Sequence, residues 1–546
     1  MPTTARNPLL PGFYPDPSVC RVGEDYYLVN SSFQYFPGLP VHHSRDLVHW
    51  RPIGHVLDRP EQLPLDRVRP SGGLYAPTIR YDGSRFHVVC TLVDGTLPGR
   101  QGNFVVSAED PAGPWSDPVW LPEAPGFDPS LFFDEDGSAY LLGTRPIPGA
   151  EPEGRTEIWL RPIRSGGDWA FTGPESILFS GALVDAVWAE GPHLYRHDGG
   201  YLLLLAEGGT ADNHAITAAR ADRITGPYRN CPRNPLLTHR HLGPGRTVTA
   251  VGHADLVQTQ HGDWYAVLLA TRPLPGPDGE PHDLLGRETF LTRVGWQDGW
   301  PLFSPGVGQV EPQLEVRLPD AADPAAAPPA ETDDFSAPVL APHWNLLRTP
   351  YRPVHQLPGT GLRLPLLPET ITERACPAFV GRRLQHHSFE AETVLDFTPT
   401  APGEAAGLVL LQDEDHQLRL LLGADDRLNP VLTLTERRAG KETLLATAAV
   451  AGAAHAAGAA GAADAAGAGA ADAAGTPLRL SVRADGLRLR FRYQGQDFAE
   501  ADATVLSTRT AGGFTGAYIG LYATSHGAPD SPNHADFPWF RYSPRP

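Results

Sequence analysis

The sequence predicts an all-β protein in which a five-bladed β-propeller is followed by a β-sandwich domain. Three observations favour this fold class. The 546 residues include 57 glycines and 57 prolines, which favours many turns between short strands. A turn-and-strand pattern recurs five times in the first 312 residues. Strands that alternate strictly between apolar and polar residues appear in the last part of the chain.

The repeated pattern is a turn that contains glycine, followed by an aromatic and apolar strand. A second short strand precedes each turn, so each copy contains a hairpin. The turn glycines are spaced by 60, 54, 62 and 63 residues, at Gly23, Gly83, Gly137, Gly199 and Gly262. Units of this length with several strands are typical of propeller blades. Five copies therefore predict a five-bladed propeller over residues 1–312, and the near-constant spacing disfavours a β-sandwich with coincidental hairpins.

The composition changes after residue 312. Residues 313–333 are rich in Pro, Ala and Asp, which predicts a linker. Beyond it, residues 478–483 and 487–493 alternate on either side of a turn, which predicts a hairpin with one buried face and, over residues 334–546, a β-sandwich. Residues 449–476 are nearly all Ala and Gly and have nothing to bury, so we predict a disordered insertion between two strands, with a short Ala-rich helix as the alternative.

Charge and cysteine content exclude several classes of protein. The formal net charge of −19 disfavours nucleic acids and anionic membranes as partners and suits a neutral ligand. The four cysteines are far apart and form no C-x-x-C pair, which excludes a cysteine-rich metal site. Neither a signal-peptide pattern nor an 18-residue apolar span occurs. We expect a cytoplasmic protein with reduced thiols.

Three carboxylates are predicted to meet at the propeller axis, which the innermost strand of each blade lines. Aligning the five first strands places Asp16, Ala76, Asp128, Glu190 and the region of His253 at the matching position. Crowded carboxylates should raise at least one pKa. Paired carboxylates across a cleft are what glycosidic bond hydrolysis requires, because one protonates the leaving oxygen and the other activates water or attacks the anomeric carbon. Asp-Pro is also a common turn dipeptide, but the repeated position favours a site.

These residues resemble those of glycoside hydrolase family 43, in the β-xylosidase branch that carries a C-terminal β-sandwich. The resemblance covers nearly the whole chain. It rests on residues 7–18 (NPLLPGFYPDPS), 126–130 (GFDPS), 190–192 (EGP), 207–210 (EGGT), 286–289 (GRET) and 535–540 (ADFPWF). The family fold that the resemblance implies is the same five-bladed propeller.

The resemblance implies a role for each carboxylate. Asp16 would be the general base that activates water, and Glu190 would be the general acid. Asp128 would hold the acid, modulate its pKa and orient the sugar. The reaction would then invert the anomeric centre in a single displacement.

The resemblance also implies substrate-binding residues, at Phe33, Tyr75, Thr210, His253, Arg287 and Phe514. Phe33 and Tyr75 would form apolar walls, and Phe514 would close the pocket from a loop of the sandwich. The alternatives are a blade-to-blade ion pair for Arg287, a core histidine for His253 and a sandwich core aromatic for Phe514. In some relatives the axial histidine lies near a metal, so a divalent cation there is an open alternative. One histidine without a ligand set is weak evidence, and we predict no required metal or other cofactor.

The function implied is an exo-acting hydrolase that releases xylose from the non-reducing ends of short β-1,4-xylo-oligosaccharides, with α-L-arabinofuranosidase side activity. The family usually carries Trp at position 75 and His at position 78, where this chain has Tyr75 and Thr78, a change that could alter the fit of xylose against arabinofuranose. One alternative is an α-L-arabinofuranosidase or arabinan- or galactoside-directed hydrolase on the same scaffold. Others are a non-catalytic sugar-binding propeller and a propeller phosphorylase. The resemblance also implies homo-dimers or tetramers, with no nucleic-acid or membrane partner.

Overall fold

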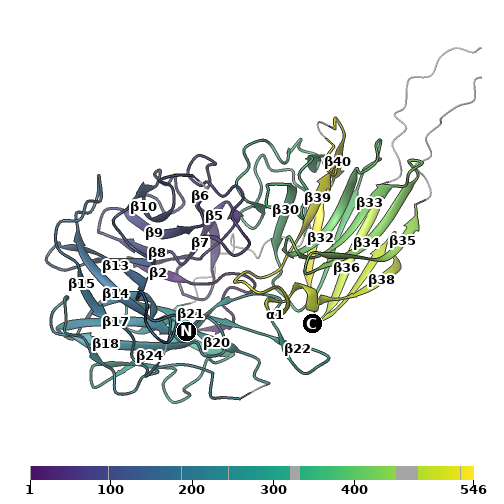
Figure 1. Ribbon diagram of the computed structural model, residues 1–546. Coiled ribbons are helices and arrows are strands. Elements are labelled where there is room, and N and C mark those ends of the chain that lie inside the picture. Colours follow the sequence, from purple (N-terminus) through teal and green to yellow (C-terminus); the bar gives the residue numbers. More distant parts are fainter. Residues whose placement is uncertain are drawn as a thin grey trace, which may run out of the picture.

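The computed structural model describes residues 2–95, 97–185, 187–243, 245–319, 332–450, 477–528 and 531–545. The propeller and the sandwich lie side by side, and the segment with α1 (Thr508–Ala511) lies at their boundary (Figure 1). The only helical elements of the described residues are α1 and a short 3-10 helix at Ala503–Leu506. None of their helices is long and apolar enough to cross a membrane. Of the predicted insertion at 449–476, all but residues 449 and 450 lie outside the described residues.

Five antiparallel sheets form the propeller blades. Blade 1 contains β2 (Ser18–Val22), β3 (Asp25–Val29), β5 (Gly38–Ser44) and β6 (Arg51–Leu57). Blade 2 contains β7 (Gly73–Leu74), β8 (Thr78–Tyr81), β9 (Phe86–Val93), β10 (Gly102–Ala108) and β11 (Val119–Trp120). Blade 3 contains β12 (Phe127–Phe133), β13 (Ala139–Pro146), β14 (Thr156–Ile163) and β15 (Ser176–Phe179). Blade 4 contains β16 (Glu190–His197), β17 (Gly200–Glu207), β18 (Ala215–Ala221) and β19 (Arg229–Asn230). Blade 5 contains β20 (Thr249–Gln258), β21 (Trp264–Thr271), β24 (Glu288–Gln297) and β25 (Trp300–Phe303), and β22 (Leu274–Pro275) pairs with β23 (Pro281–His282) in a separate ribbon.

The five predicted hairpins are confirmed as the inner strand pair of each blade. Their turn glycines all have positive φ, with values of 64°, 97°, 84°, 71° and 89° from Gly23 to Gly262. This left-handed conformation strains any residue that carries a Cβ atom. The glycine repeat in the sequence is therefore a backbone requirement of the blade.

The start and the end of the propeller segment pair with each other. β1 (Pro2–Arg6) lies antiparallel to β26 (Gln313–Pro319), with Ala5 opposite Leu314. The predicted linker at 313–333 is thus wrong for its first seven residues, because they form a strand whose alternate side chains are buried. Residues 332–333 also pair, as β27 (Thr332–Asp333), with a strand of the sandwich.

One carboxylate joins four of the blades at the axis. Asp255 of β20 is fully buried, and its two oxygens accept hydrogen bonds from the Ser18 hydroxyl (2.7 Å) and the Tyr195 hydroxyl (2.5 Å). Arg80 of blade 2 forms a two-pronged ion pair with the same carboxylate, at 2.8 and 3.1 Å. Burial opposes ionisation of Asp255, but Arg80 and these hydrogen bonds outweigh it and hold its pKa below the ordinary value. An ionised, buried Asp255 therefore ties four blades together near the axis.

The second domain is a sandwich of two large antiparallel sheets. One contains, in order, β35 (Lys441–Ala449), β34 (Pro430–Arg438), β33 (His416–Ala424), β32 (Ala405–Asp413), β39 (Tyr518–Thr524), β30 (Ala378–Arg383), β28 (Asn345–Leu347) and β4 (Tyr35–Phe36). The other contains β27, β41 (Phe540–Pro544), β31 (Ser388–Leu395), β36 (Leu478–Asp485), β37 (Arg488–Tyr493) and β38 (Gln496–Asp502), and β29 (Leu362–Pro365) pairs with β40 (His534–Phe537) separately. The predicted hairpin at 478–493 is confirmed as β36 and β37.

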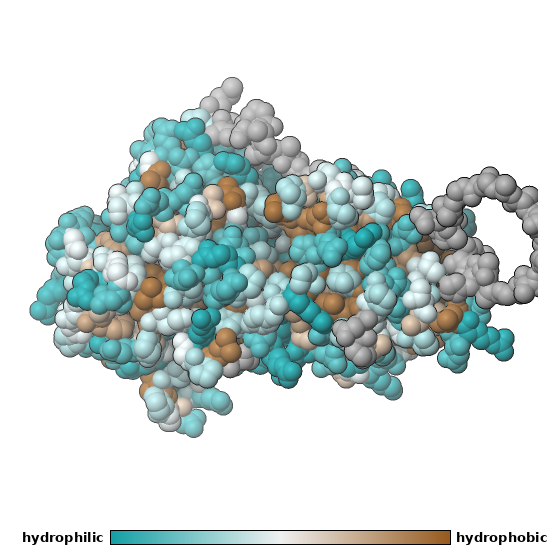
Figure 2. Space-filling model, turned by 90° about the horizontal axis from the view of Figure 1, so that it is seen from above, coloured by the Kyte–Doolittle hydropathy of each residue, from teal (hydrophilic) through white to brown (hydrophobic). Residues whose placement is uncertain are grey.

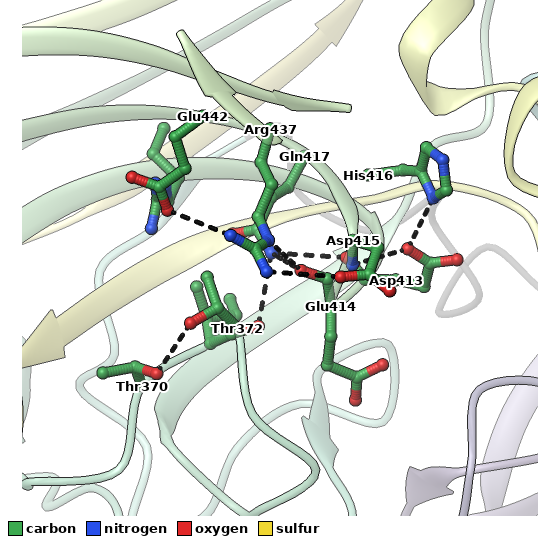
Figure 3. A network of polar contacts seen from close by, with 11 residues as sticks. Thr370, Thr372, Asp413, Glu414, Asp415, His416, Gln417, Arg437 and Glu442 are labelled. Atoms are coloured by element: carbon green, nitrogen blue, oxygen red, sulfur yellow. Dashed lines mark hydrogen bonds and ion pairs between the residues drawn. The ribbon is translucent and has the colours of Figure 1, made fainter. Parts of the chain in front are cut away.

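The propeller supplies the edge strand of the larger sandwich sheet. β4 precedes β5 in the chain, yet it pairs with β28, placing Phe36 opposite Leu346. A second link is Arg348, which is fully buried, donates to the Val68 carbonyl of the propeller at 2.8 Å and pairs with Glu414. Behind Glu414, Arg437 donates to the Glu414 backbone carbonyl at 3.0 Å, as Figure 3 shows. The two domains therefore share a sheet, and a buried ion pair of the sandwich is hydrogen-bonded to the propeller backbone.

Candidate active site

The nine predicted site residues line one pocket at the propeller axis. The pocket is bounded by Asp16, Phe33, Tyr75, Asp128, Glu190, Thr210, His253, Arg287 and Phe514, together with Ala76 and Phe127. All five blades and the sandwich contribute to its wall. On the face of the molecule that Figure 2 shows, hydrophobic residues lie in scattered groups between hydrophilic ones.

Backbone bulges direct the axial side chains into the pocket. Asp16, Asp128 and His253 have φ of 51°, 50° and 48°, values that non-glycine residues seldom adopt. Strand pairing is interrupted at the corresponding places of blades 3, 4 and 5. A bulge re-aims a side chain and often accompanies an active site. The same bulge, repeated around the axis, brings residues from distant parts of the sequence to one spot.

The predicted alignment of Glu190 is wrong by one residue. Phe127 pairs with Thr144 before the bulge of blade 3, and Glu190 pairs with Ala206 before the bulge of blade 4. Glu190 therefore corresponds to Phe127, and the counterpart of Asp128 is Gly191. A Cβ atom at Gly191, whose φ is 58°, would lie 2.9 Å from the His253 ring. The crowded axis thus leaves room only for glycine there, and the acid comes from the preceding residue.

Asp16 lies in a setting that favours its ionised form. Its carboxylate accepts hydrogen bonds from the Ser31 hydroxyl at 2.5 Å and from Arg287 Nη1 at 2.8 Å, and His253 Nδ1 lies 3.9 Å away. Burial alone would raise its pKa, but Arg287, His253 and the Ser31 hydrogen bond together lower the pKa below the ordinary value. Asp16 therefore stays a carboxylate over most of the pH range.

Asp128 and Glu190 lie in the opposite kind of setting. Burial, followed by the nearby charge of Asp16, raises the pKa of Asp128 to about 7, although the Gly191 amide donates to it at 3.1 Å. Burial and the charges of Asp128 and Asp16 raise the pKa of Glu190 well above its ordinary value. The predicted crowding of three carboxylates thus yields one ionised group and two that hold protons more tightly.

Arg287 connects Asp16 to the sandwich loop that carries Phe514. Besides Asp16, it donates to the Thr210 hydroxyl at 3.2 Å and to the Phe514 carbonyl at 3.4 Å. Its guanidinium also lies 5.5 Å from the centre of the Phe33 ring and 5.6 Å from that of Phe514. Arg287 does form an ion pair between blades, as the alternative proposed, but its partner is Asp16 and the pair lies inside the pocket.

Three aromatic rings form the apolar wall. Phe33 lies 5.2 Å from Tyr75 and 6.1 Å from Phe514, measured between ring centroids. Phe514 is 37% exposed and so is not a core residue of the sandwich. Its backbone amide donates to the Ser71 hydroxyl of the propeller at 2.8 Å. The sandwich loop is thereby anchored across the pocket.

Two comparisons decide the family. A model of glycosyl hydrolases family 43 matches residues 5–301, and a model of the beta xylosidase C-terminal concanavalin A-like domain matches residues 332–543. The chain belongs to glycosyl hydrolase family 43. The predicted resemblance and fold class are confirmed, and this family 43 chain is a glycoside hydrolase of the xylosidase/arabinosidase type.

Full-length relatives and solved structures agree with the family. The chain is 41% identical over 548 residues to a xylosidase/arabinosidase of Butyrivibrio fibrisolvens, covering 98% of each chain. It is 37% identical to a non-reducing end α-L-arabinofuranosidase of Bacteroides ovatus, covering 99% of this chain and 94% of the relative. The crystal structure of a xylan β-1,4-xylosidase from Bacillus halodurans matches with a TM-score of 0.87 at 34% identity, covering 99% and 100% of the two chains.

Sequence reasoning missed some residues that the structure places at this family 43 site. Ser31 donates to Asp16 from the strand end of blade 1, and Phe127 lines the pocket next to Asp128. Phe127 could have been found as the residue before the second Asp-Pro, whereas nothing in the sequence singles out Ser31. Among the described residues, no cluster of three or more His, Cys, Asp or Glu side chains has the spacing of a metal site.

Proposed function

We propose that this protein is an inverting exo-hydrolase that releases xylose from the non-reducing ends of short β-1,4-xylo-oligosaccharides, with α-L-arabinofuranosidase side activity. The observation that carries the proposal is the split in pKa between two carboxyl groups of one pocket. Asp16 has a lowered pKa and Glu190 a strongly raised one. Such a pair supplies a base and an acid at the same pH.

In the proposed reaction, Asp16 accepts a proton from a water molecule as the water oxygen bonds to the anomeric carbon. The bond from that carbon to the leaving oxygen breaks, and Glu190 donates its proton to this oxygen. Asp128 accepts a hydrogen bond from the Gly191 amide and, once it is ionised, raises the pKa of Glu190 further, while burial and the charge of Asp16 raise it at any pH at which Asp16 is ionised. The products are xylose with inverted configuration and an oligosaccharide shorter by one sugar.

The wall of the pocket supports exo action on a neutral sugar. Phe33, Tyr75 and Phe514 surround it, and Ser71 and Arg287 hold the Phe514 loop in place. A pocket covered by a loop accepts one terminal sugar rather than the middle of a chain. Names of relatives support the sugar class, since they include a β-xylosidase of Bacillus subtilis that is 34% identical to this chain.

A second candidate is an α-L-arabinofuranosidase on the same scaffold. The arabinofuranosidase of Bacteroides ovatus favours it, being more similar to this chain than the Bacillus subtilis β-xylosidase is. The residue to examine is Tyr75, which forms part of the apolar wall beside Phe33.

The test compares hydrolysis of 4-nitrophenyl β-D-xylopyranoside and 4-nitrophenyl α-L-arabinofuranoside by the wild type, Asp16→Ala and Glu190→Ala. We expect the xyloside to be preferred and Asp16→Ala to reduce kcat by about 10²–10⁴-fold. Dominant arabinofuranoside turnover would favour the second candidate. Binding of both sugars without turnover of either would contradict catalysis.

A further inference from the structure

Trp188 is an exposed indole next to the proposed acid. It lies two residues before Glu190 and is 37% exposed, and no other tryptophan in the described part of the chain is exposed to that extent. Burying an aromatic ring of this size is strongly favourable, so an indole left in water calls for an explanation.

The indole of Trp188 packs closely against its neighbours on one side. Its ring centroid lies 6.5 Å from that of Phe127, which lines the catalytic pocket. A Cβ atom at Gly154 would lie 2.9 Å from the indole, and one at Gly209 would lie 3.4 Å from it. Glycine at position 154 therefore lets the indole pack against the backbone where a Cβ atom would be too close, and the ring lies partly exposed beside Phe127 of the pocket.

The backbone of Trp188 is also held in an unfavourable conformation. Its φ is 56°, which is an outlier for a bulky residue. The Trp188 amide donates to the Gly154 carbonyl at 2.8 Å, and the Gly208 amide donates to the Val187 carbonyl at 2.8 Å. Strain of this kind persists only where neighbouring contacts enforce it, and it is concentrated at functional sites.

The position of Glu190 indicates where the leaving sugar binds relative to Trp188. A general acid must come within hydrogen-bonding distance of the leaving oxygen, so the leaving sugar lies on the Glu190 side of the pocket. The apolar face of a pyranose ring is suited to an aromatic surface, and exposed aromatics beside a few polar groups are typical of ligand sites.

We propose that Trp188, together with Phe127, forms the platform on which the leaving sugar stacks, so that Trp188 is a specificity-determining residue for the oligosaccharide. The inference rests on the proposed function. Stacking on Trp188 would stabilise the bound leaving sugar. It would contribute little to binding of the terminal sugar in the inner pocket.

The test measures kcat/KM for xylobiose, whose leaving group is a sugar, and for β-D-xylopyranosyl fluoride, whose leaving group is a single atom. We expect Trp188→Ala to lower the ratio of the two values, xylobiose over fluoride, about tenfold, mainly through the KM for xylobiose. Trp188→Phe keeps an aromatic face and should recover most of the ratio. Val184→Ala changes a residue of the same segment that is 93% exposed and should leave the ratio at the wild-type value.

Equal losses on both substrates in Trp188→Ala would overturn the inference, because they would show that the indole only holds the Glu190 segment in place. An unchanged ratio with wild-type activity would overturn it as well. A wild type that hydrolyses neither substrate would overturn the proposed function itself, which separates that failure from a failure of the inference alone.

Discussion

Asp16 and Glu190 carry the same functional group in one pocket, and their neighbours separate their pKa values. Asp16 faces Arg287, His253 and the Ser31 hydroxyl, all of which favour a negative charge. Glu190 faces two other carboxyl groups and is desolvated, so its proton is retained. The residues alone predicted crowding at the axis, and only the family resemblance assigned Asp16 as the base and Glu190 as the acid, because the physical cause of that difference lies in contacts such as the Ser31 hydrogen bond that the sequence does not show.

Ser31→Ala should shift the acid limb of the pH–rate profile. The Ser31 hydroxyl donates to Asp16 and favours its ionised form, so its removal raises the pKa of Asp16. The rate rises as the base loses its proton, and the acid limb of kcat/KM should therefore move to higher pH. Kinetics from pH 3 to 9 on the aryl xyloside would check this. A shift of the alkaline limb alone would contradict the assignment of Asp16 as the base.

Asp128→Asn should shift the alkaline limb of the pH–rate profile. The Asp128 carboxylate opposes ionisation of Glu190, so its removal lowers the pKa of Glu190. Activity falls as the acid loses its proton, and the alkaline limb of kcat/KM should therefore move to lower pH, while the acid limb does not move up. The same pH series measures both. An alkaline limb that stays in place would show that Asp128 does not set the acidity of Glu190.

At the scale of elements, the hairpins could be predicted and the bulges could not. The turn glycines recur at near-constant spacing because every inner hairpin requires positive φ at that position. The bulges at Asp128 and His253 also have positive φ, but they carry ordinary side chains and leave no compositional mark. This is why the pattern placed Glu190 one residue out of register. The linker prediction for β26 was wrong for another reason, because the Pro-, Ala- and Asp-rich composition of residues 313–333 concealed the short alternating strand at its start.

Gly191→Ala and Gly199→Ala form a matched pair at this scale. Both glycines have positive φ, 58° and 71°, so the backbone strain of each alanine should lower the free energy of unfolding by about 1–2 kcal/mol, and the contact with His253 adds to this at position 191. A Cβ atom at Gly199 meets nothing within 4 Å, whereas one at Gly191 meets the His253 ring and shifts the amide that donates to Asp128. We expect only Gly191→Ala to lose activity beyond its loss of stability. Thermal unfolding and kcat/KM at pH 6 check this, and equal activities would contradict it.

At the scale of the molecule, the two domains are parts of one packing unit. The resemblance predicted that a sandwich loop closes the propeller pocket, but the shared sheet could not be predicted, because the pairing of β4 with β28 joins residues more than 300 positions apart. One hydrophobic cluster contains Val68 and Leu74 of the propeller together with Trp344 and Val380 of the sandwich. Closure of the pocket by Phe514 depends on this rigid junction, since the loop belongs to the sandwich and the carboxylates to the propeller.

Arg348→Met should therefore destabilise both domains together. Arg348 is fully buried between the Val68 carbonyl and Glu414, and its loss leaves a buried carboxyl group without its partner. Breaking such a pair lowers the free energy of unfolding by about 3–5 kcal/mol. We expect calorimetry to show one transition at a lower Tm, because the shared sheet and core transmit the loss to the propeller. Arg352→Met is the control: Arg352 pairs with Glu369 at the surface, and an exposed pair of this kind contributes about 1 kcal/mol or less. Two separate transitions in Arg348→Met, with the propeller unaffected, would show that the junction holds the domains side by side without coupling their stability.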